Sequence, residues 1–319
     1  MNIKTFLTPQ LGSRLKSIIN PLRHFRARCE TEAHSQLPFE PFRDYISAAR
    51  RMGLTRPYLF LSFDCDTDWD AEVVEEVHNL LELHGIKATY AVPGAQLLKS
   101  PEPYQRLASR GAEFMNHGAL PHTEWRGDQW VGITFYDSMS PVKVEDDIRR
   151  GHAIVQEVIG QPPKGFRAPH FGCFQKPHQL ELVHRLAEDL GYDYCSTTLP
   201  SFGLSKGPVV AIPNRRVVEI SCFGSLRNPE TILDSWTYLA DRKQYALGEM
   251  YEKLMVETVE AFTKQKLPVV FTWYADPCHV INQLTFMRSM KHLAKAGVVS
   301  VAGAELISMV AKQTSNSTN

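Results

Sequence analysis

The stretch Pro57-Tyr-Leu-Phe-Leu-Ser-Phe-Asp-Cys-Asp66 decides the fold. Its residues 59–63 are apolar except for Ser62, which is typical of a buried strand in a parallel sheet. Asp64 and Asp66 come at the end of that strand, one residue apart. Because α/β folds place their chemistry at the carboxyl ends of strands, this pair is the first candidate for a functional site. The alternative is that both acids only cap the next helix and face solvent.

Strands and helices alternate from this stretch to the end of the chain. Thr67 with Asp70 matches a capping box, and an apolar helical pattern follows from Val73 to Leu81. Further strands are predicted at 87–92, 112–116, near 165 and 194, at 217–221 and at 268–274, with helices at about 104–109, 141–159, 180–190 and 230–264, and a helix, a strand and a helix from there to about 311. Residues 117–140 are predicted to form a polar, aromatic loop. This alternation favours a barrel-like α/β fold or a doubly wound sheet.

Composition excludes some classes of protein. At 319 residues the chain is long enough to bury a sizeable core, as one large α/β domain or two smaller ones. Its 35 Lys and Arg residues balance its 35 Asp and Glu residues, so no global field favours nucleic acid as a partner. The six cysteines are scattered without a Cys-x-x-Cys pair, which is typical of reduced thiols in a cytoplasmic protein. The sequence indicates no particular oligomeric state.

The N-terminal segment differs from the rest. Residues 1–29 hold six Lys and Arg residues and no acid, and apolar residues recur at helical spacing from Leu7 to Phe25. This pattern indicates either peripheral contact with an anionic membrane or a helix that packs on the domain or stays mobile. We expect no transmembrane helix and no secretory signal, and hence a cytoplasmic location, with the inner face of the membrane as an alternative. The predicted segments are an extension (1–50), one α/β domain (51–312) and a polar tail (313–319).

Ionisable residues follow four of the predicted strands. They are Asp64 with Asp66, His117 with His122, Arg167 with His170, and Asp276 with His279. One histidine alone is more often a structural group, but the loops at one end of a barrel converge on a single rim. One Asp and two His suit a divalent metal that keeps open positions, a second carboxylate takes a proton from water, and a distant His protonates a leaving group.

The ordered motifs carry a family resemblance. They are Ser62-Phe-Asp-Cys-Asp66, Asn116-His-Gly-Ala-Leu-Pro-His-Thr123, Gly165-Phe-Arg-Ala-Pro-His-Phe-Gly172 and Trp273-Tyr-Ala-Asp-Pro-Cys-His279. This set resembles the polysaccharide deacetylase family, also called carbohydrate esterase family 4 or the NodB-homology domain, in its Asp-x-Asp branch. The resemblance spans residues 57–310. It implies a distorted (β/α)7 barrel, of the TIM-like type, and metal-dependent hydrolysis of an N-acyl or O-acyl bond.

The resemblance also implies a role for each matching residue. It makes Asp64 the catalytic base, kept ionised by Arg167, and His279 the general acid. The metal ligands it implies are Asp66, His117 and His122. Substrate binding is assigned to His170 and Trp125, although Trp125 either stacks on a sugar ring or only packs at the rim. Zinc is the default ion for this ligand set, with cobalt, nickel, manganese or iron as alternatives.

Two departures from the family pattern concern geometry. Four residues, Gly118 to Pro121, separate the two histidines, where the family usually has three. A loop with Gly118 and Pro121 can bring both imidazoles to one metal, which a helical turn does less well. His279 lies several residues after its strand, and Asp276 either orients it or caps a helix.

Three functions are consistent with these residues. The first is removal of an N-acetyl or other acyl group from an amino sugar in a glycan or glycolipid. The second is hydrolysis of a C–N bond in a small molecule by an amidohydrolase on the same fold. The third is a catalytically silent relative, against which the joint presence of Asp64, Arg167 and His279 argues.

Overall fold

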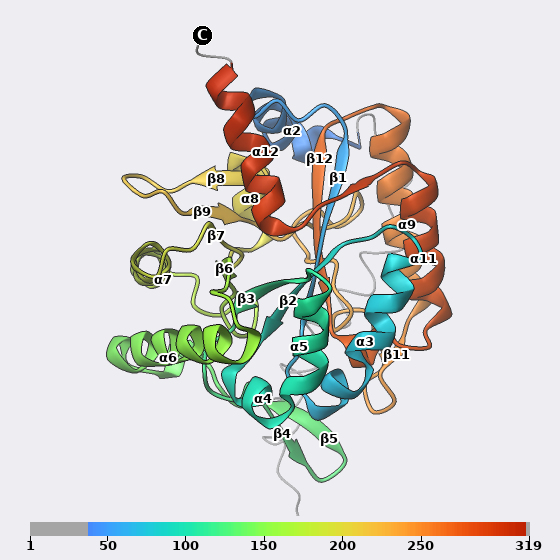
Figure 1. Ribbon diagram of the computed structural model, residues 1–319. Coiled ribbons are helices and arrows are strands. Elements are labelled where there is room, and N and C mark those ends of the chain that lie inside the picture. Colours follow the sequence, from blue (N-terminus) through green and yellow to red (C-terminus); the bar gives the residue numbers. More distant parts are fainter. Residues whose placement is uncertain (1–37, 317–319) are drawn as a thin grey trace, which may run out of the picture. The chain divides into compact units, whose positions relative to one another are not determined.

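The computed structural model describes residues 38–316 (Figure 1). The chain divides into two units, Met1–Glu40 and Pro41–Asn319, and the elements that form the site belong to the second. The basic pattern in residues 1–29 lies outside the described residues, so the membrane contact and cytoplasmic location expected from the sequence stay predictions. Across the described range, no helix combines the length and the apolar composition needed to cross a bilayer.

Seven parallel strands form the frame of the second unit. They lie in the order β12-β1-β2-β3-β6-β7-β9, while β8 pairs antiparallel with β9 and β13 pairs with β1. The bounds are β1 (Pro57–Asp64), β2 (Ala88–Val92), β3 (Glu113–Asn116), β6 (Gly165–Phe166), β7 (Tyr194–Cys195), β8 (Val209–Ala211), β9 (Val218–Ile220), β12 (Val269–Ala275) and β13 (Val299–Ser300).

Strand β1 is the centre of this sheet, as its sequence predicts. All eight of its residues are buried, because the sheet is covered on both faces. It pairs with β12 from Pro57↔Val269 to Phe63↔Ala275, and with β2 from Leu61 onward. The parallel register places the carboxyl ends of β1, β2 and β12 at one edge, where the polar motifs lie.

The sheet curls back on itself beyond β9. The backbone N–H of Phe223 donates to the carbonyl oxygen of Thr272 in β12 over 2.9 Å. Asp234 then forms a parallel bridge with Tyr274 of the same strand. These contacts bring the two ends of the strand order together irregularly, so the predicted distorted (β/α)7 barrel is confirmed.

Helices surround the sheet. Neighbouring helices pack in a series, α9 with α11, α3 with α5, α5 with α6 and α6 with α7 (Figure 1). The bounds are η1 (Glu40–Phe42), α2 (Arg43–Arg51), α3 (Asp68–Glu82), α4 (Gly94–Lys99), α5 (Pro101–Ser109), η2 (Tyr136–Ser138), α6 (Pro141–Ile159), α7 (Pro177–Asp189), α8 (Pro200–Lys206), α9 (Glu249–Lys264), α10 (Pro277–Val280), α11 (Leu284–Lys295) and α12 (Gly303–Asn316). Helix α2 packs on α8, and the hydroxyl of its Tyr45 donates to the Val270 carbonyl over 2.8 Å.

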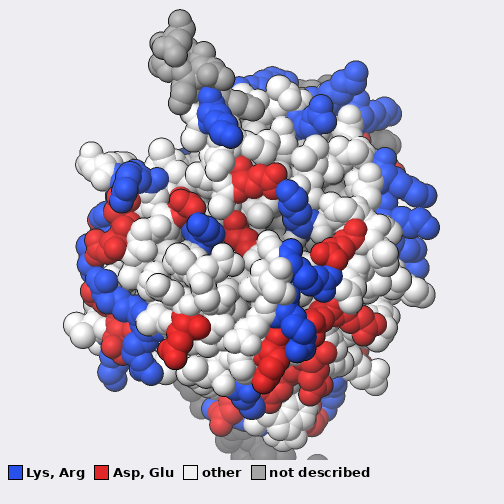
Figure 2. Space-filling view, in the orientation of Figure 1, with Lys and Arg blue, Asp and Glu red and all other residues white. Residues whose placement is uncertain are grey.

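Charged side chains of both signs are interspersed over the face shown in Figure 2. The described residues include exposed ion pairs, such as Arg106 with Glu75 and Lys99 with Asp68, both at 2.6 Å. Exposed pairs of this kind contribute little to stability, typically below about 1 kcal/mol.

Two antiparallel hairpins depart from the prediction. The first, β4 (Thr123–Arg126) with β5 (Gln129–Gly132), lies in the segment predicted as a loop. The second, β10 (Leu239–Asp241) with β11 (Ala246–Leu247), lies where a helix is predicted from 230, and that prediction is wrong up to Gly248. Side-chain hydrogen bonds from Thr237 to Asp234 form a turn there, which competes with helix formation. An ion pair between Lys243 and Asp128 joins the second hairpin to the first.

Candidate active site

Arg167 holds Asp64 at the end of β1. The Arg167 side chain is completely buried, and its Nη1 donates to Asp64 Oδ1 over 2.8 Å. Its Nη2 donates to the hydroxyls of Ser62 (2.8 Å) and Ser196 (3.0 Å). A guanidinium with a planar set of donors suits this arrangement, because it bonds several acceptors in one plane. The second oxygen of Asp64 is thus left facing the site.

Burial determines the acidity of Asp64. It raises the pKa of Asp64 to about 6, while the charge of Arg167 acts in the opposite direction and that of Asp66 adds to the rise. The sequence-based interpretation gives the contribution of Arg167 its correct sign, but desolvation is larger. The net result is a carboxylate that is ionised at neutral pH and more basic than an exposed one.

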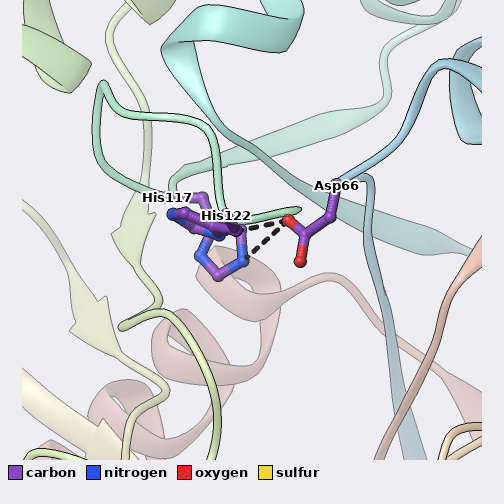
Figure 3. Close-up of side chains that lie close together, drawn as sticks. All are labelled: Asp66, His117 and His122. Carbon is purple, nitrogen blue, oxygen red and sulfur yellow. Dashed lines mark hydrogen bonds and ion pairs between the residues drawn. The ribbon is translucent and has the colours of Figure 1, made fainter. Parts of the chain in front are cut away.

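Asp66, His117 and His122 lie together, as Figure 3 shows. The Asp66 Oδ1 atom lies 3.1 Å from Nδ1 of His122 and 3.6 Å from Nε2 of His117. The imidazole centroids are 4.2 Å apart. One candidate ligand atom from each residue lies within 4.8 Å of the others. Burial acts to raise the pKa of Asp66, but the neighbouring His122, His117 and His170 together outweigh it and hold that pKa below its usual value.

These three residues fit a divalent cation. His117 Nδ1 lies 2.8 Å from the backbone carbonyl oxygen of Arg167, which can only accept, so this nitrogen carries the hydrogen. Burial keeps the pKa of His117 well below its usual value, which leaves a lone pair on Nε2. That lone pair faces oxygens of Asp66 (3.6 Å) and Asp64 (3.9 Å), an arrangement that a cation stabilises and that is repulsive without one. The Nε2 of His122 is also buried without a hydrogen-bond partner.

Asp147 holds the four-residue loop between the two histidines. This buried carboxylate of α6 accepts hydrogen bonds from the backbone N–H groups of Ala119 (3.1 Å) and Leu120 (2.8 Å). Gly118 has φ +80°, and a Cβ there would lie 2.4 Å from Asp147 Oδ2. The side chain of Asn116 accepts from the Gly118 N–H over 2.9 Å. The hydrogen bonds of Asp147 and Asn116, with the close approach at Gly118, therefore hold this loop in its conformation.

His279 lies in α10, after the end of β12. Its Nδ1 is 3.2 Å from Asp276 Oδ2 and 3.1 Å from Ser235 Oγ. Asp276 makes no side-chain cap at the start of α10, so of the two alternatives its carboxylate fits an orienting role. Trp236 stacks on the imidazole at 5.0 Å, and Tyr245 lies at 4.5 Å. Burial lowers the pKa of His279 to about 3, and Asp66 is near enough for its charge to act against this.

His170 lies next to the metal-binding cluster, whereas Trp125 lies on the exposed hairpin β4–β5. His170 has φ +55°, stacks on Phe135 at 4.3 Å and lies 5.9 Å from the His122 ring. Its Nε2 is buried without a hydrogen-bond partner. Trp125 is 53% exposed on β4 and meets Trp130 edge-on at 5.5 Å. A cavity of about 120 Å³ lies between Asp66 and Trp130, so the hairpin borders the metal side of the site.

Several neighbours of the candidate site were not predicted from the sequence. They are Ser62, Ser196, Asp147, Ser235, Trp236 and Tyr245. Ser62 is the polar residue in an otherwise apolar strand and could have been a signal, whereas Ser196 directly follows the short strand β7. Trp236 and Tyr245 fall in the segment wrongly predicted as helix. Asp147 lies in a helix directly after two other charged residues, Glu145 and Asp146, and its burial has no signal in the local pattern.

The comparisons with known proteins agree with this geometry. Residues 52–195 match the model of the family described as polysaccharide deacetylase, a range that contains Asp64, Asp66, His117, His122 and Arg167. No curated protein sequence is significantly similar to the chain.

Two solved structures share the fold. One, from Mycobacterium smegmatis and assigned as a polysaccharide deacetylase, has 18% identity and a TM-score of 0.63, over 81% of this chain and 92% of that one. Another with the same assignment, from Pseudomonas aeruginosa PAO1, has 12% identity and a TM-score of 0.58, over 88% of this chain and 95% of that one. Residues 52–195 are therefore similar to the polysaccharide deacetylase family, whose members act on non-peptide C–N bonds in carbohydrates, and the chain shares the fold of two solved structures with that assignment.

Proposed function

We propose that this protein is a metal-dependent hydrolase that removes an N-acetyl or other acyl group from an amino sugar in a glycan or glycolipid. The observation that carries the proposal is the meeting of three groups at one edge of the barrel. These are the Arg167-bound carboxylate of Asp64, the Asp66–His117–His122 cluster and the Asp276-bound imidazole of His279. A base, a cation site and an acid are what hydrolysis of an amide requires.

Asp64 serves as the base. Arg167 occupies its Oδ1, so Oδ2 is the oxygen that takes a proton from the attacking water. Its pKa of about 6 leaves it ionised at neutral pH and keeps it basic enough to accept that proton. Ser62 and Ser196 fix the guanidinium that holds Asp64.

Asp66, His117 and His122 hold the metal ion. When bound, a divalent metal polarises the acyl oxygen and increases the acidity of water. The Arg167 carbonyl keeps His117 in the tautomer that presents Nε2, a common arrangement behind metal-binding histidines. Zinc is the first candidate, with cobalt, nickel, manganese and iron as alternatives.

His279 serves as the acid. An amine leaves poorly unless it is protonated. Burial lowers the pKa of His279 to about 3, which leaves the imidazole neutral in the resting site, and the charge of Asp66 acts in the direction that favours its protonated form. Asp276 and Ser235 both face Nδ1, which leaves Nε2 for the substrate. Burial and the neighbouring Asp70 raise the pKa of Asp276, and an imidazolium at 3.2 Å favours its ionised form, so the two groups stabilise each other's charge while the proton is in transit.

Substrate contacts are assigned to His170 and Trp125. His170 presents a buried, unbonded Nε2 close to His122, where it can bond a substrate hydroxyl. Trp125 is 53% exposed and contacts Trp130, which lines the cavity that reaches Asp66. An exposed indole face suits the apolar face of a sugar ring.

A second candidate function is hydrolysis of a C–N bond in a small molecule. It is favoured by the low exposure of the reacting groups, with side-chain exposures of 11% for Asp64 and 3% for His279. A small compound reaches such groups more easily than a polymer.

The test is metal content and product release in the same preparations. Wild type, His117→Ala and His122→Ala are compared with His178→Ala, which changes an exposed histidine of α7. We expect about one equivalent of metal in wild type and His178→Ala and a loss in both ligand variants. Acetate release from N-acetylated amino sugars supports the first function, and ammonia release from amides and ureides supports the second. If neither product is released with any divalent metal, the proposal is refuted.

A further inference from the structure

Asp70 is a buried carboxylate that sequence reasoning assigns only to a helix cap. Its side chain is completely excluded from solvent in the first turn of α3. Oδ2 accepts from the backbone N–H of Thr67 (2.9 Å) and from its hydroxyl (2.7 Å). Oδ1 accepts from the backbone N–H of Cys278 over 2.9 Å. Helix capping explains the hydrogen bonds of Oδ2 but not the hydrogen bond of Oδ1.

The second contact joins two segments that are far apart in sequence. Thr67, before α3, directly follows the metal ligand Asp66, and Cys278, in α10, directly precedes His279. The pairing of β1 with β12 ends at Phe63↔Ala275, so both segments lie beyond the last paired residues. Asp70 holds them together past that point, because one oxygen bonds each segment.

A carboxylate suits this position better than an amide. Three donors converge on Asp70, and a carboxylate has only acceptor positions. An asparagine turned either way directs its NH2 group at one of the two backbone N–H groups. Keeping a carboxylate fully buried is costly unless its hydrogen bonds are satisfied, as they are here.

We propose that Asp70 is a positioning residue that fixes His279 relative to the metal-binding loop. It acts through the Cys278 backbone and touches neither substrate nor metal. The inference rests on the proposed function, because it assigns His279 the role of acid. Loss of Asp70 then impairs proton delivery to the leaving group and leaves the attack on the acyl carbon largely intact.

The experiment compares two leaving groups in Asp70→Asn. An N-acetylated amino sugar needs a proton on its departing amine, whereas an aryl acetate with an acidic phenol does not. We expect kcat on the amide to fall about 10- to 100-fold at nearly unchanged KM, since a small misplacement of a catalytic group has effects of this size. We expect aryl acetate hydrolysis and metal content to stay close to wild type, the same pattern as in His279→Ala.

Glu113→Gln is the matched control. Glu113 is a partly buried carboxylate at the opposite end of the barrel, and it accepts hydrogen bonds from the backbone N–H groups of Gly303 (2.9 Å) and Ala304 (3.0 Å). It shares the carboxylate-to-amide change and the loss of a helix-end contact, so it reports a general loss of stability. We expect it to affect both substrates equally or not at all. Equal losses on both substrates in Asp70→Asn, or no loss on the amide, would overturn the inference.

A second measurement separates this inference from the proposed function. If wild type hydrolyses neither substrate with any divalent metal, the proposed function fails on its own. The imidazole nitrogens of His279 are then followed by NMR, with their signals assigned through His279→Ala. A changed hydrogen-bond pattern at His279 in Asp70→Asn, but not in Glu113→Gln, supports the positioning role. Unchanged signals in Asp70→Asn would refute it.

Discussion

Arg167 Nη1 donates a hydrogen bond to Asp64 Oδ1 over 2.8 Å, and the Arg167 side chain is completely buried. The pair joins the ends of β1 and β6, which lie 103 residues apart in the chain. Breaking a buried pair by removing one partner is strongly destabilising, by about 3–5 kcal/mol, because the other charge stays buried. The chemical role of Arg167 is therefore best tested with its charge kept.

Arg167→Lys keeps the charge and removes the planar set of donors. One ammonium group does not bond Asp64, Ser62 and Ser196 in the geometry that the guanidinium uses. Burial raises the pKa of Asp64 and the charge of Arg167 lowers it, so a weaker ion pair lets this pKa rise further above about 6. We expect the acid limb of the kcat/KM profile to move to higher pH by about one unit, with roughly tenfold lower kcat/KM below that limb. The control is Arg288→Lys, which changes an exposed ion pair and should leave the profile as in wild type. An equally unchanged profile in Arg167→Lys would contradict the role of Arg167.

Asp147→Asn tests how the histidine loop is held. The amide places an NH2 group toward the N–H groups of Ala119 and Leu120 or toward the Tyr136 hydroxyl, which donates to Asp147 over 2.6 Å. We expect metal affinity to fall about 10- to 100-fold, as for other residues that orient metal ligands. Equilibrium dialysis measures the change. The control is Asp146→Asn, whose side chain is 65% exposed on the same helix, and equal affinities in the two variants would contradict the prediction.

Asp234 gives a prediction for stability against pH. Burial raises its pKa to about 6 in the folded protein, against 3.8 for the unfolded reference. A raised folded pKa means that the contribution to stability is present below about pH 4 and is lost as pH rises through about 6. Two units correspond to about 3 kcal/mol. We expect the Tm of wild type to fall relative to that of Asp234→Asn between pH 4 and pH 7.5, and a constant difference would contradict the assignment.

The sequence predicts most of the frame and the reacting groups. Strands β1 and β12 are continuous apolar runs, so both are found with their bounds nearly correct. Polar motifs at their ends are expected to share one edge, because parallel strands end together. The structure brings Asp64, Asp66 and His279 to that edge, although their chemical roles stay proposals.

The rest depends on contacts that local patterns do not contain. Strands β6 and β7 have two residues each, too short for any periodicity. Ser235 is recognised as part of the site only once the chain folds it against His279, 44 residues later. The second oxygen of Asp70 likewise finds its donor 208 residues away. Patterns of period two or 3.6 report which face is buried, and they do not report which distant residue meets it.

Substitution of Trp125 distinguishes sugar stacking from rim packing. Its indole is 53% exposed and meets Trp130 by an edge contact, so its removal costs little stability, within about 0.5 kcal/mol. If it stacks on a sugar, Trp125→Ala raises KM for N-acetylated oligosaccharides about 5- to 20-fold, in line with stacking energies near 1–2 kcal/mol, at unchanged kcat. Trp125→Tyr keeps an aromatic face and should restore most of the affinity.

The matched control is Val142→Ala, which removes an apolar side chain that is 78% exposed on α6. We expect its KM to equal that of wild type on every substrate. A KM increase in Trp125→Ala that grows from monosaccharide to oligosaccharide places a sugar ring on the hairpin, because only the longer substrate reaches it. Equal KM values for Trp125→Ala and wild type on all lengths would reduce Trp125 to packing against Trp130, and the substrate role would then rest on His170.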